Sequence, residues 1–231
     1  MRRTSAGVLA GLSLAVGLAG CSGSRTPVQA APAPAATPAA TASPAAANRP
    51  AANPADVAFM SGMIHHHRQA VLIAGWAPSH GASEAIQRLC ERIVVGQGDE
   101  IDLLSRWLED HGLPVPAPDT AMMLGATSHA GMNHGAMGPG AMDHSQMPGM
   151  LSAAELKALD AARGPAFDRL FLEDMIKHHK GALVMVDQLF GSQGGGQDED
   201  VFRLASNVYA DQSTEIGRMQ KMLDALPSPS H

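Results

Sequence analysis

The sequence predicts an all-α protein in which two similar helical hairpins pair into a four-helix bundle, and three observations support this. Apolar residues recur at helical spacing within residues 55–113 and again within residues 152–226. The two stretches resemble each other, which indicates an internal duplication. A single hairpin of this size would bury too little surface to be stable, so we expect the two to pack together with approximate two-fold symmetry.

The first hairpin is expected at residues 55–113. One face of its first helix carries Asp56, Phe59, Met60, Met63, His67, Ala70 and Ala74. The second helix has an inner stripe that includes Gln97 and Glu100. Gly112 and Pro114 follow it, as expected for a helix end.

The second hairpin is expected at residues 152–226 and repeats this plan. The helix that carries His179 follows its counterpart at an offset of 112 positions, and the helix that carries Glu215 follows at an offset of 115. The additional residues fit the glycine-rich loop at residues 191–196. The duplication therefore extends over both helices of the hairpin.

The N-terminal residues indicate export and lipid anchoring. Residues 1–20 combine a basic start with a short uncharged apolar stretch, which is typical of a secretory signal and shorter than the about 20 residues of a membrane span. The segment that ends at Cys21 resembles a bacterial lipobox, so we expect a lipid at Cys21, although an ordinary signal peptide would also fit. Residues 21–54 are rich in Ala and Pro and predict a disordered tether.

The composition of the chain narrows the classes of function that it could have. The chain has 16 Lys and Arg against 22 Asp and Glu, a formal charge of −6, which argues against nucleic acid as a partner. It has 14 Met and 11 His beside five Phe, two Trp and one Tyr. Methionine can fill a core, but Met and His together are also copper ligands. No nucleophile–base arrangement, phosphate loop or nucleotide fingerprint points to a hydrolase or a transferase.

A Met-Ile-x-His-His motif occurs once in each hairpin. Its Met and His residues are Met63, His66, His67, Met175, His178 and His179. A Met and a His four residues later lie above one another on a helix and could converge on one ion. Glu100 and Glu215 lie on the neighbouring inner stripes, where a carboxylate must be paired or bound to metal. Two interpretations stay open: a metal site that includes the glutamates, or buried His–Glu hydrogen bonds that fix the helix register.

Four other polar residues receive simpler interpretations. His65 is expected to be solvated, because its counterpart in the second hairpin is Lys177. Asp56 and Asp168 lie near helix starts and could be caps or partners of the helix dipole. Cys90 lies on an inner stripe and is expected to be a buried thiol rather than a ligand.

The linker at residues 114–151 carries the most specific metal signal. Two hexapeptides with the spacing Met-x-His-x-x-Met follow each other here. They comprise Met132, His134, Met137, Met142, His144 and Met147. They resemble the Met-rich repeats of bacterial copper-resistance proteins, and soft thioethers select Cu(I), whereas imidazole also suits Cu(II). The alternative is a low-complexity linker in which the methionines are incidental.

The combined pattern in both hairpins resembles domain of unknown function 305. It reads Asp-x-x-Phe-x-x-x-Met-Ile-x-His-His, with Gln-x-x-Glu-Ile on the next helix. This bacterial family includes CopM-type periplasmic copper-binding proteins. The resemblance implies a ferritin-like all-α fold, two tandem copies, and copper binding by the Met and His residues of the motif. The first copy departs mildly from the pattern, with Gln69 where the second has Gly181.

These inferences predict an extracytoplasmic copper-binding lipoprotein of the cell envelope, which sequesters or hands over Cu(I) in copper tolerance. Its expected partners are copper ions, the membrane through Cys21, and a copper efflux or chaperone protein. The sequence favours a binding protein over an enzyme. The rivals are a ferritin-like metal oxidase and an envelope interaction module with a structural polar core. Against the oxidase, the chain lacks the Glu-x-x-His motifs that are typical of di-iron bundles.

Overall fold

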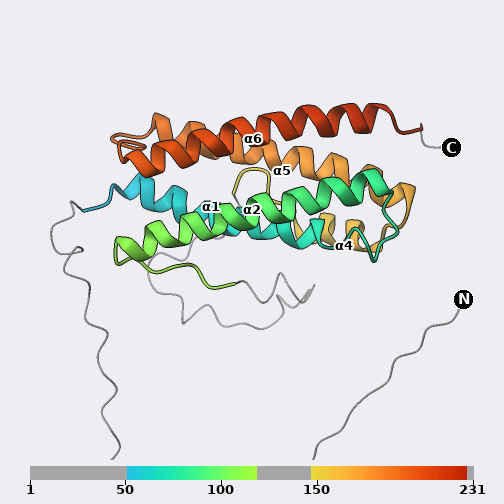
Figure 1. The fold of residues 1–231 in the computed structure, drawn as a ribbon, viewed down its shortest axis with the longest axis horizontal. Coiled ribbons are helices and arrows are strands. Elements are labelled where there is room, and N and C mark those ends of the chain that lie inside the picture. Colours follow the sequence, from blue (N-terminus) through green and yellow to red (C-terminus); the bar gives the residue numbers. More distant parts are fainter. Residues whose placement is uncertain (1–50, 119–146, 228–231) are drawn as a thin grey trace, which may run out of the picture. The chain divides into compact units, whose positions relative to one another are not determined.

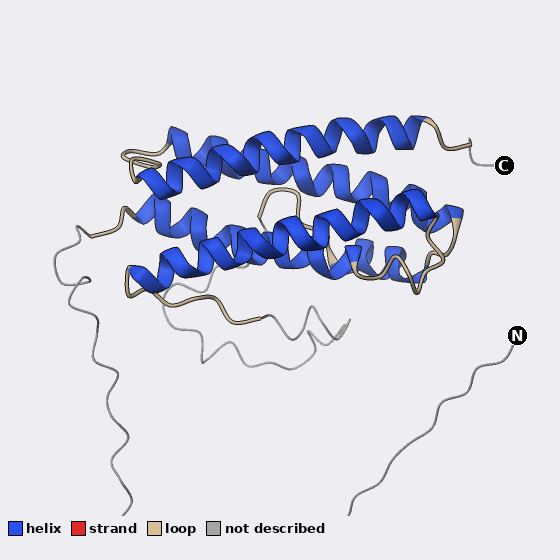
Figure 2. Cartoon of the chain, viewed as in Figure 1, coloured by secondary structure: helices blue, strands red, loops and turns tan. Residues whose placement is uncertain are grey.

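The computed structural model describes residues 51–118 and 147–227, and this part of the chain is all-helical (Figures 1 and 2). Its helices are α1 (Pro54–Ala74), α2 (Glu84–Asp110), α4 (Ala153–Ala161), α5 (Pro165–Gly191) and α6 (Glu199–Asp224). The prediction of an all-α bundle is confirmed. Residues 1–50 and 119–146, which include most of the predicted tether and linker, lie outside the described residues. Within the described ranges, no helix has the length and apolar character needed to cross a membrane.

The four long helices form the bundle, and α1 and α5 make the contact between its two halves. α1 packs along α2, α5 packs along α6, and α1 also packs against α5 (Figure 1). α4 is an addition to the predicted second hairpin and packs against α5. A capping box starts α4, in which Ser152 and Glu155 each bond the backbone N–H of the other.

The core consists of two apolar clusters. One joins the second half of α1 to the first half of α5 and includes Ile73 and Phe167. The other joins the first half of α1 to the second half of α5 and includes Met60 and Val186. The two helices therefore run in opposite directions. A layer of buried polar side chains lies between the clusters; it comprises His66, His67, Gln97, His178, His179 and Gln212.

Asp56 and Asp168 connect the two hairpins. The Asp56 carboxylate accepts a hydrogen bond of 2.6 Å from the Gly196 N–H, in the loop between α5 and α6. The Asp168 carboxylate accepts from the Ser83 N–H at 3.1 and 3.2 Å, in the loop between α1 and α2. Both aspartates lie in the first turn of their helices, as predicted, but each bonds the loop of the opposite hairpin instead of capping its own helix.

Replacement of Asp168 should therefore destabilise the bundle. Asp168→Ala removes a charged acceptor from the Ser83 N–H, and we expect the free energy of unfolding to fall by about 1.5–3 kcal/mol. Urea denaturation followed by circular dichroism measures this change. Asp187→Ala, on the exposed face of the same helix, should change the stability by less than about 0.5 kcal/mol. Equal effects of the two substitutions would contradict the contact's role.

Candidate metal centre

Four fully buried imidazoles meet where α1 and α5 pack together. His66 and His67 come from α1, and His178 and His179 come from α5. The rings of His66 and His178 are in contact, with centroids 3.8 Å apart and planes inclined by 37°. Adjacent helical residues point about 100° apart. Each motif therefore sends one imidazole toward the other motif and one toward its neighbouring helix.

The second imidazole of each motif pairs with the predicted glutamate. His67 Nε2 lies 2.6 Å from Glu100 Oε2 on α2, and His179 Nε2 lies 2.7 Å from Glu215 Oε2 on α6. The two glutamate side chains are 15% and 24% exposed, so each carboxylate connects a buried ring to the surface. The sequence therefore located both pairs, and the geometry shows direct His–Glu hydrogen bonds.

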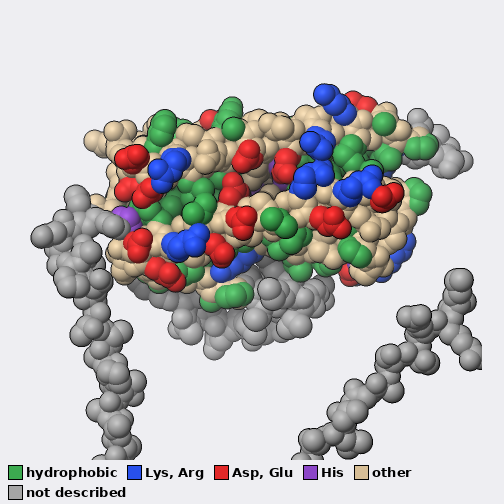
Figure 3. Space-filling view, viewed as in Figure 1, with side chains coloured by type: hydrophobic (Ala, Val, Ile, Leu, Met, Phe, Trp, Pro, Cys, Tyr) green, Lys and Arg blue, Asp and Glu red, His purple; other side chains and the backbone are tan. Residues whose placement is uncertain are grey.

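A third carboxyl group lies near the two glutamates. The pKa of Asp211 is raised by burial and by the negative charges of Glu100 and Glu215. On this face, acidic side chains alternate with Lys and Arg over α2 and α6 (Figure 3). The three carboxyl groups therefore lie on the side of the layer where His67 and His179 are anchored.

A short segment, Met147–Leu151, which we call the strap, contacts both α1 and α5 beside the layer. The Pro148 carbonyl lies 3.1 Å from His66 Nε2. The Gln69 side chain forms two hydrogen bonds with the Leu151 backbone: its amide donates to the carbonyl at 3.1 Å, and its oxygen accepts from the N–H at 2.7 Å. The end of the predicted linker is therefore part of the bundle.

Gln69 and Gly181 occupy equivalent positions of the two hairpins, 112 residues apart, and both contact the strap. A Cβ on Gly181 would lie 2.0 Å from the Pro148 carbonyl oxygen and 2.5 Å from the Gly149 Cα, so only glycine allows this approach. The departure from the motif pattern at Gln69 thus has a physical reason. In the first copy, Gln69 binds the strap by hydrogen bonds. In the second copy, Gly181 leaves room for the backbone of the strap.

The hydrogen bonds of the layer leave ring nitrogens available. A carbonyl or a carboxylate accepts from Nε2, which places the proton there in His66, His67 and His179. The Nδ1 atoms of these three rings are buried and have no hydrogen-bond partner, and His178 has none at either nitrogen. Metal-binding histidines commonly have this arrangement, in which one ring nitrogen donates to a carbonyl or carboxylate and the other is a ligand.

The two central imidazoles are neutral. Burial, reinforced by the neighbouring His67, lowers the pKa of His66 to about 3. Burial and the adjacent His66 lower the pKa of His178 well below its ordinary value. Neutral imidazole is the form that binds metal. In the neutral state His178 must also carry one N–H without a hydrogen-bond partner, which costs about 1–3 kcal/mol. A metal ion bound in the layer would change this cost.

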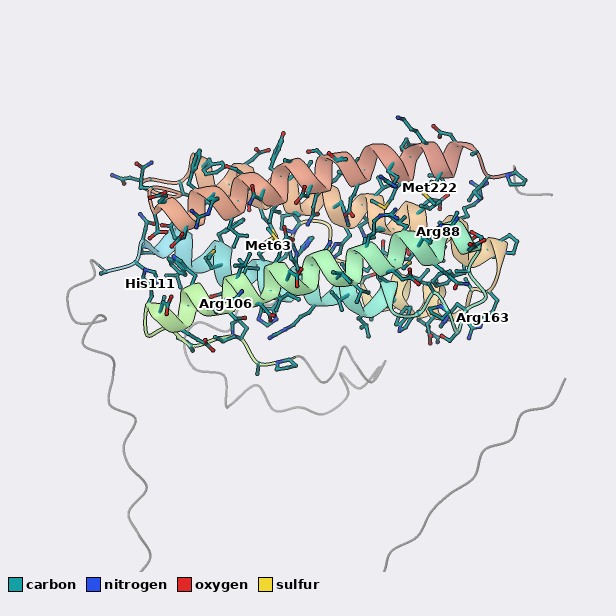
Figure 4. The ribbon with its side chains drawn as sticks, viewed as in Figure 1. Met63, Arg88, Arg106, His111, Arg163 and Met222 are labelled. Atoms are coloured by element: carbon teal, nitrogen blue, oxygen red, sulfur yellow. The ribbon has the colours of Figure 1, made fainter. Side chains whose placement is uncertain are left out.

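The motif methionines flank the layer. Met63 and Met175 are fully buried, Met63 in one apolar cluster and Met175 in the other. Met63 lies near the middle of the bundle's length in Figure 4. Among the described residues, no three His, Cys, Asp or Glu side chains are grouped so that they could hold a metal ion.

The remaining candidate residues divide between the core and the undescribed segments. Met132, His134, Met137, Met142, His144 and Cys21 lie outside the described residues. Met147 is described and packs against the apolar cluster around Met60. His65 is half-buried. His80, in the α1–α2 loop, is buried and lies 3.1 Å from the Asp160 carboxylate, which ties this loop to α4.

The chain belongs to the family described as "Domain of unknown function (DUF305)", whose model matches residues 56–223 and so spans both hairpins in one match. No curated protein matches the chain.

Solved structures of the family have the same fold. A DUF305 fragment from Deinococcus radiodurans is 26% identical, with a TM-score of 0.59, over 77% of this chain and 100% of that one. CopM in the Cu(I)-bound form is 25% identical, with a TM-score of 0.51, over 73% of this chain and 95% of that one. CopM in the Cu(II)-bound form is also 25% identical, with a TM-score of 0.53 and the same coverage.

The close contact between the strap and Gly181 can be tested by substitution. Gly181→Ala should displace the strap, because the new Cβ would overlap the Pro148 carbonyl, and the Leu151 N–H should then exchange faster with deuterium. Gly98→Ala is the matched control, since a Cβ there meets nothing within 4 Å; it should stabilise α2 by about 0.5–1 kcal/mol. Unchanged exchange at Leu151 in the Gly181 variant would refute the contact.

Cys90 should behave as a core thiol. It is 2% exposed, and burial, with a contribution from Asp168, raises its pKa to about 12. The thiolate is the reactive and metal-binding form, so alkylation by iodoacetamide near neutral pH should be slow in the folded protein and fast in urea. Mass spectrometry of the Cys90 peptide measures both rates. Fast alkylation without urea would show an accessible thiol and reopen Cys90 as a ligand.

Proposed function

We propose that this protein binds copper, chiefly Cu(I), in the imidazole layer between α1 and α5, and that it sequesters the ion or hands it over. The observation that carries the proposal is the layer itself: four buried imidazoles, each with an Nδ1 that has no partner, beside Met63 and Met175. A purely structural layer would be expected to satisfy these buried nitrogens.

The donor set suits copper better than other metals. Thioethers are soft ligands that favour Cu(I), and imidazole binds both oxidation states of copper. Zinc is also bound by imidazole, but its sites add thiolates or carboxylates and not thioethers, and the thiol of Cys90 lies in an apolar cluster. In the proposed site Glu100 and Glu215 hold the rings of His67 and His179 in orientation, and the imidazoles bind the ion.

The family comparison supports the choice of metal. CopM, which is similar to this chain in both sequence and fold, has been crystallised in Cu(I)-bound and Cu(II)-bound forms. We extend this property to the present chain because the residues that suit copper converge in the bundle. The reciprocal loop contacts of Asp56 and Asp168 fit an origin by duplication, and we retain two ferritin-like copies as part of the proposal.

The segments outside the bundle complete the proposal. Residues 1–20 would direct export and Cys21 would anchor the protein by lipid on the extracytoplasmic side of the membrane. Residues 21–54 would act as a tether, and the hexapeptides of the linker at residues 114–151 would capture Cu(I). A copper efflux or chaperone protein would be the recipient of the ion.

A ferritin-like metal oxidase is the second candidate. One observation favours it: the carboxyl groups of Glu100, Asp211 and Glu215 influence one another close to His67 and His179. Hard carboxylate oxygens would suit iron. Consumption of oxygen on addition of Fe(II), abolished by Glu100→Gln, would favour this function, whereas Cu(I) binding without oxygen turnover favours the first.

A competition titration with a Cu(I) chelator tests the main proposal. His66→Leu combined with His178→Leu should remove the tight binding that belongs to the bundle, because both central imidazoles are lost. His65→Lys is the control, since Lys177 occupies the equivalent position, and it should bind Cu(I) as the parent protein does.

A second set of variants separates the linker from the bundle. Leucine at Met132, Met137 and Met142 should lower the number of Cu(I) ions bound and leave the bundle site intact. Weak binding by the parent protein, unchanged by either set of substitutions, would overturn copper binding. Thermal unfolding of each variant confirms that the bundle is still folded.

A further inference from the structure

Two methionine side chains meet above Gly62, outside the imidazole layer. The Sδ of Met147 lies 3.5 Å, and the Cε of Met185 lies 3.3 Å, from the point that a Cβ on Gly62 would occupy. Met147 belongs to the strap and Met185 to α5, so α1, α5 and the strap all contribute to this place. The absence of a side chain at Gly62 leaves room for the Met147 sulfur and the Met185 methyl group at the same point.

The second hairpin has a different residue at the equivalent position. Asp174 follows Gly62 by 112 residues and is only 7% exposed. Burial, with a contribution from Glu155, raises the pKa of Asp174 to about 6, and one of its carboxyl oxygens has no hydrogen-bond partner. The two methionines therefore meet beside Gly62 of the first hairpin, whereas the equivalent position of the second hairpin carries a carboxyl group.

Met147 is held in this position by its neighbours in the strap. Pro148 is bonded to His66, Gly149 lies against Gly181, and Leu151 is bonded to Gln69. Met147 itself is half-buried, whereas Met185 is 8% exposed. A fixed pair of methionine side chains that solvent can reach at one side is suited to binding an ion. A contact that served only core packing would not need this exposure.

The two methionines also lie close to other methionines of the bundle core. Met147 and Met185 belong to the same apolar cluster as Met60 and Met63. Met63 directly follows Gly62 in α1, and it is the methionine of the first Met-Ile-x-His-His motif. Met60, Met63, Met147 and Met185 therefore lie in one apolar cluster, which includes both the half-exposed strap residue and the methionine of the first motif.

We propose that Met147 and Met185 form a second site for Cu(I), through which the ion enters the bundle and passes to Met63 and the imidazoles. This inference rests on the proposed function. Thioethers carry no proton at neutral pH, so the ion moves by exchange of neutral ligands and keeps its oxidation state. The site is selective for soft monovalent cations, and Ag(I) can serve as a probe.

Methionine methyl NMR tests this site directly. The purified protein is labelled with ¹³C at the methionine methyl groups, each signal is assigned by a Met→Leu variant, and Ag(I) or Cu(I) is added in steps. The Met147 and Met185 signals should shift together, and those of Met63 and Met175 should shift as the layer fills. Met219, buried in the other cluster, should not shift. If Met63 and Met175 respond while Met147 and Met185 do not, the entry site is wrong and the proposed function stands; if none of the four responds, both fail.

Variants then test the entry route. Met147→Leu with Met185→Leu replaces the sulfurs by groups of similar volume, a change that costs less than about 1.5 kcal/mol per site. This variant should bind one ion fewer per chain and should fill the imidazole layer more slowly in stopped-flow measurements. Met219→Leu, in the other apolar cluster, is the control and should load as the parent does. Gly62→Ala, which fills the point between the thioethers, should reproduce the slow loading, and loading at the parent rate in both variants would overturn the route.

Discussion

The burial of four imidazoles at one level of the bundle is the constraint on which the rest of the structure depends. A polar ring away from water must be hydrogen-bonded, or its desolvation costs about 1–3 kcal/mol. α2 and α6 each supply a glutamate, and the strap supplies the Pro148 carbonyl. The apolar clusters on either side hold the layer in place, because they bury the large side chains of all four long helices.

The strap makes a nearly symmetric bundle functionally asymmetric. A single segment can bind only one of two equivalent surfaces in a given way, and the residues at equivalent positions have diverged accordingly. Gln69 bonds the strap and Gly181 admits it, while Gly62 leaves room for two methionine side chains and the equivalent position of the second hairpin carries Asp174. Glutamates from α2 and α6 contact the layer on one side, and the strap contacts it through the Pro148 carbonyl. The two sides of the layer therefore present different ligands.

Helical periodicity and duplication were sufficient to predict the long helices and to name the histidines and glutamates of the inner faces, because these features depend on spacing along one helix and on repetition. They left two interpretations of these residues, a metal site or His–Glu hydrogen bonds, and the structure has the hydrogen bonds. The strap and α4 were missed, since neither has a helical period long enough to be recognised. The Pro148-Gly149 turn and the Ser152–Glu155 capping box were the local signals for them. The cross-hairpin bonds of Asp56 and Asp168 depend on how the hairpins pair, which local sequence does not specify. Cys90 was predicted as a core thiol from its position, and it is buried.

The central claim is that the imidazole layer binds Cu(I) through Nδ1 while Nε2 stays bonded to its acceptor. Long-range ¹H–¹⁵N NMR of the histidine rings, with and without Cu(I), tests this most directly because it distinguishes the two nitrogens of each ring. We expect the Nδ1 signals of the layer to move on metal addition, while Nε2 of His66, His67 and His179 stays protonated. Loss of those Nε2 protons, or no change at any ring of the layer when Cu(I) is bound, would contradict it.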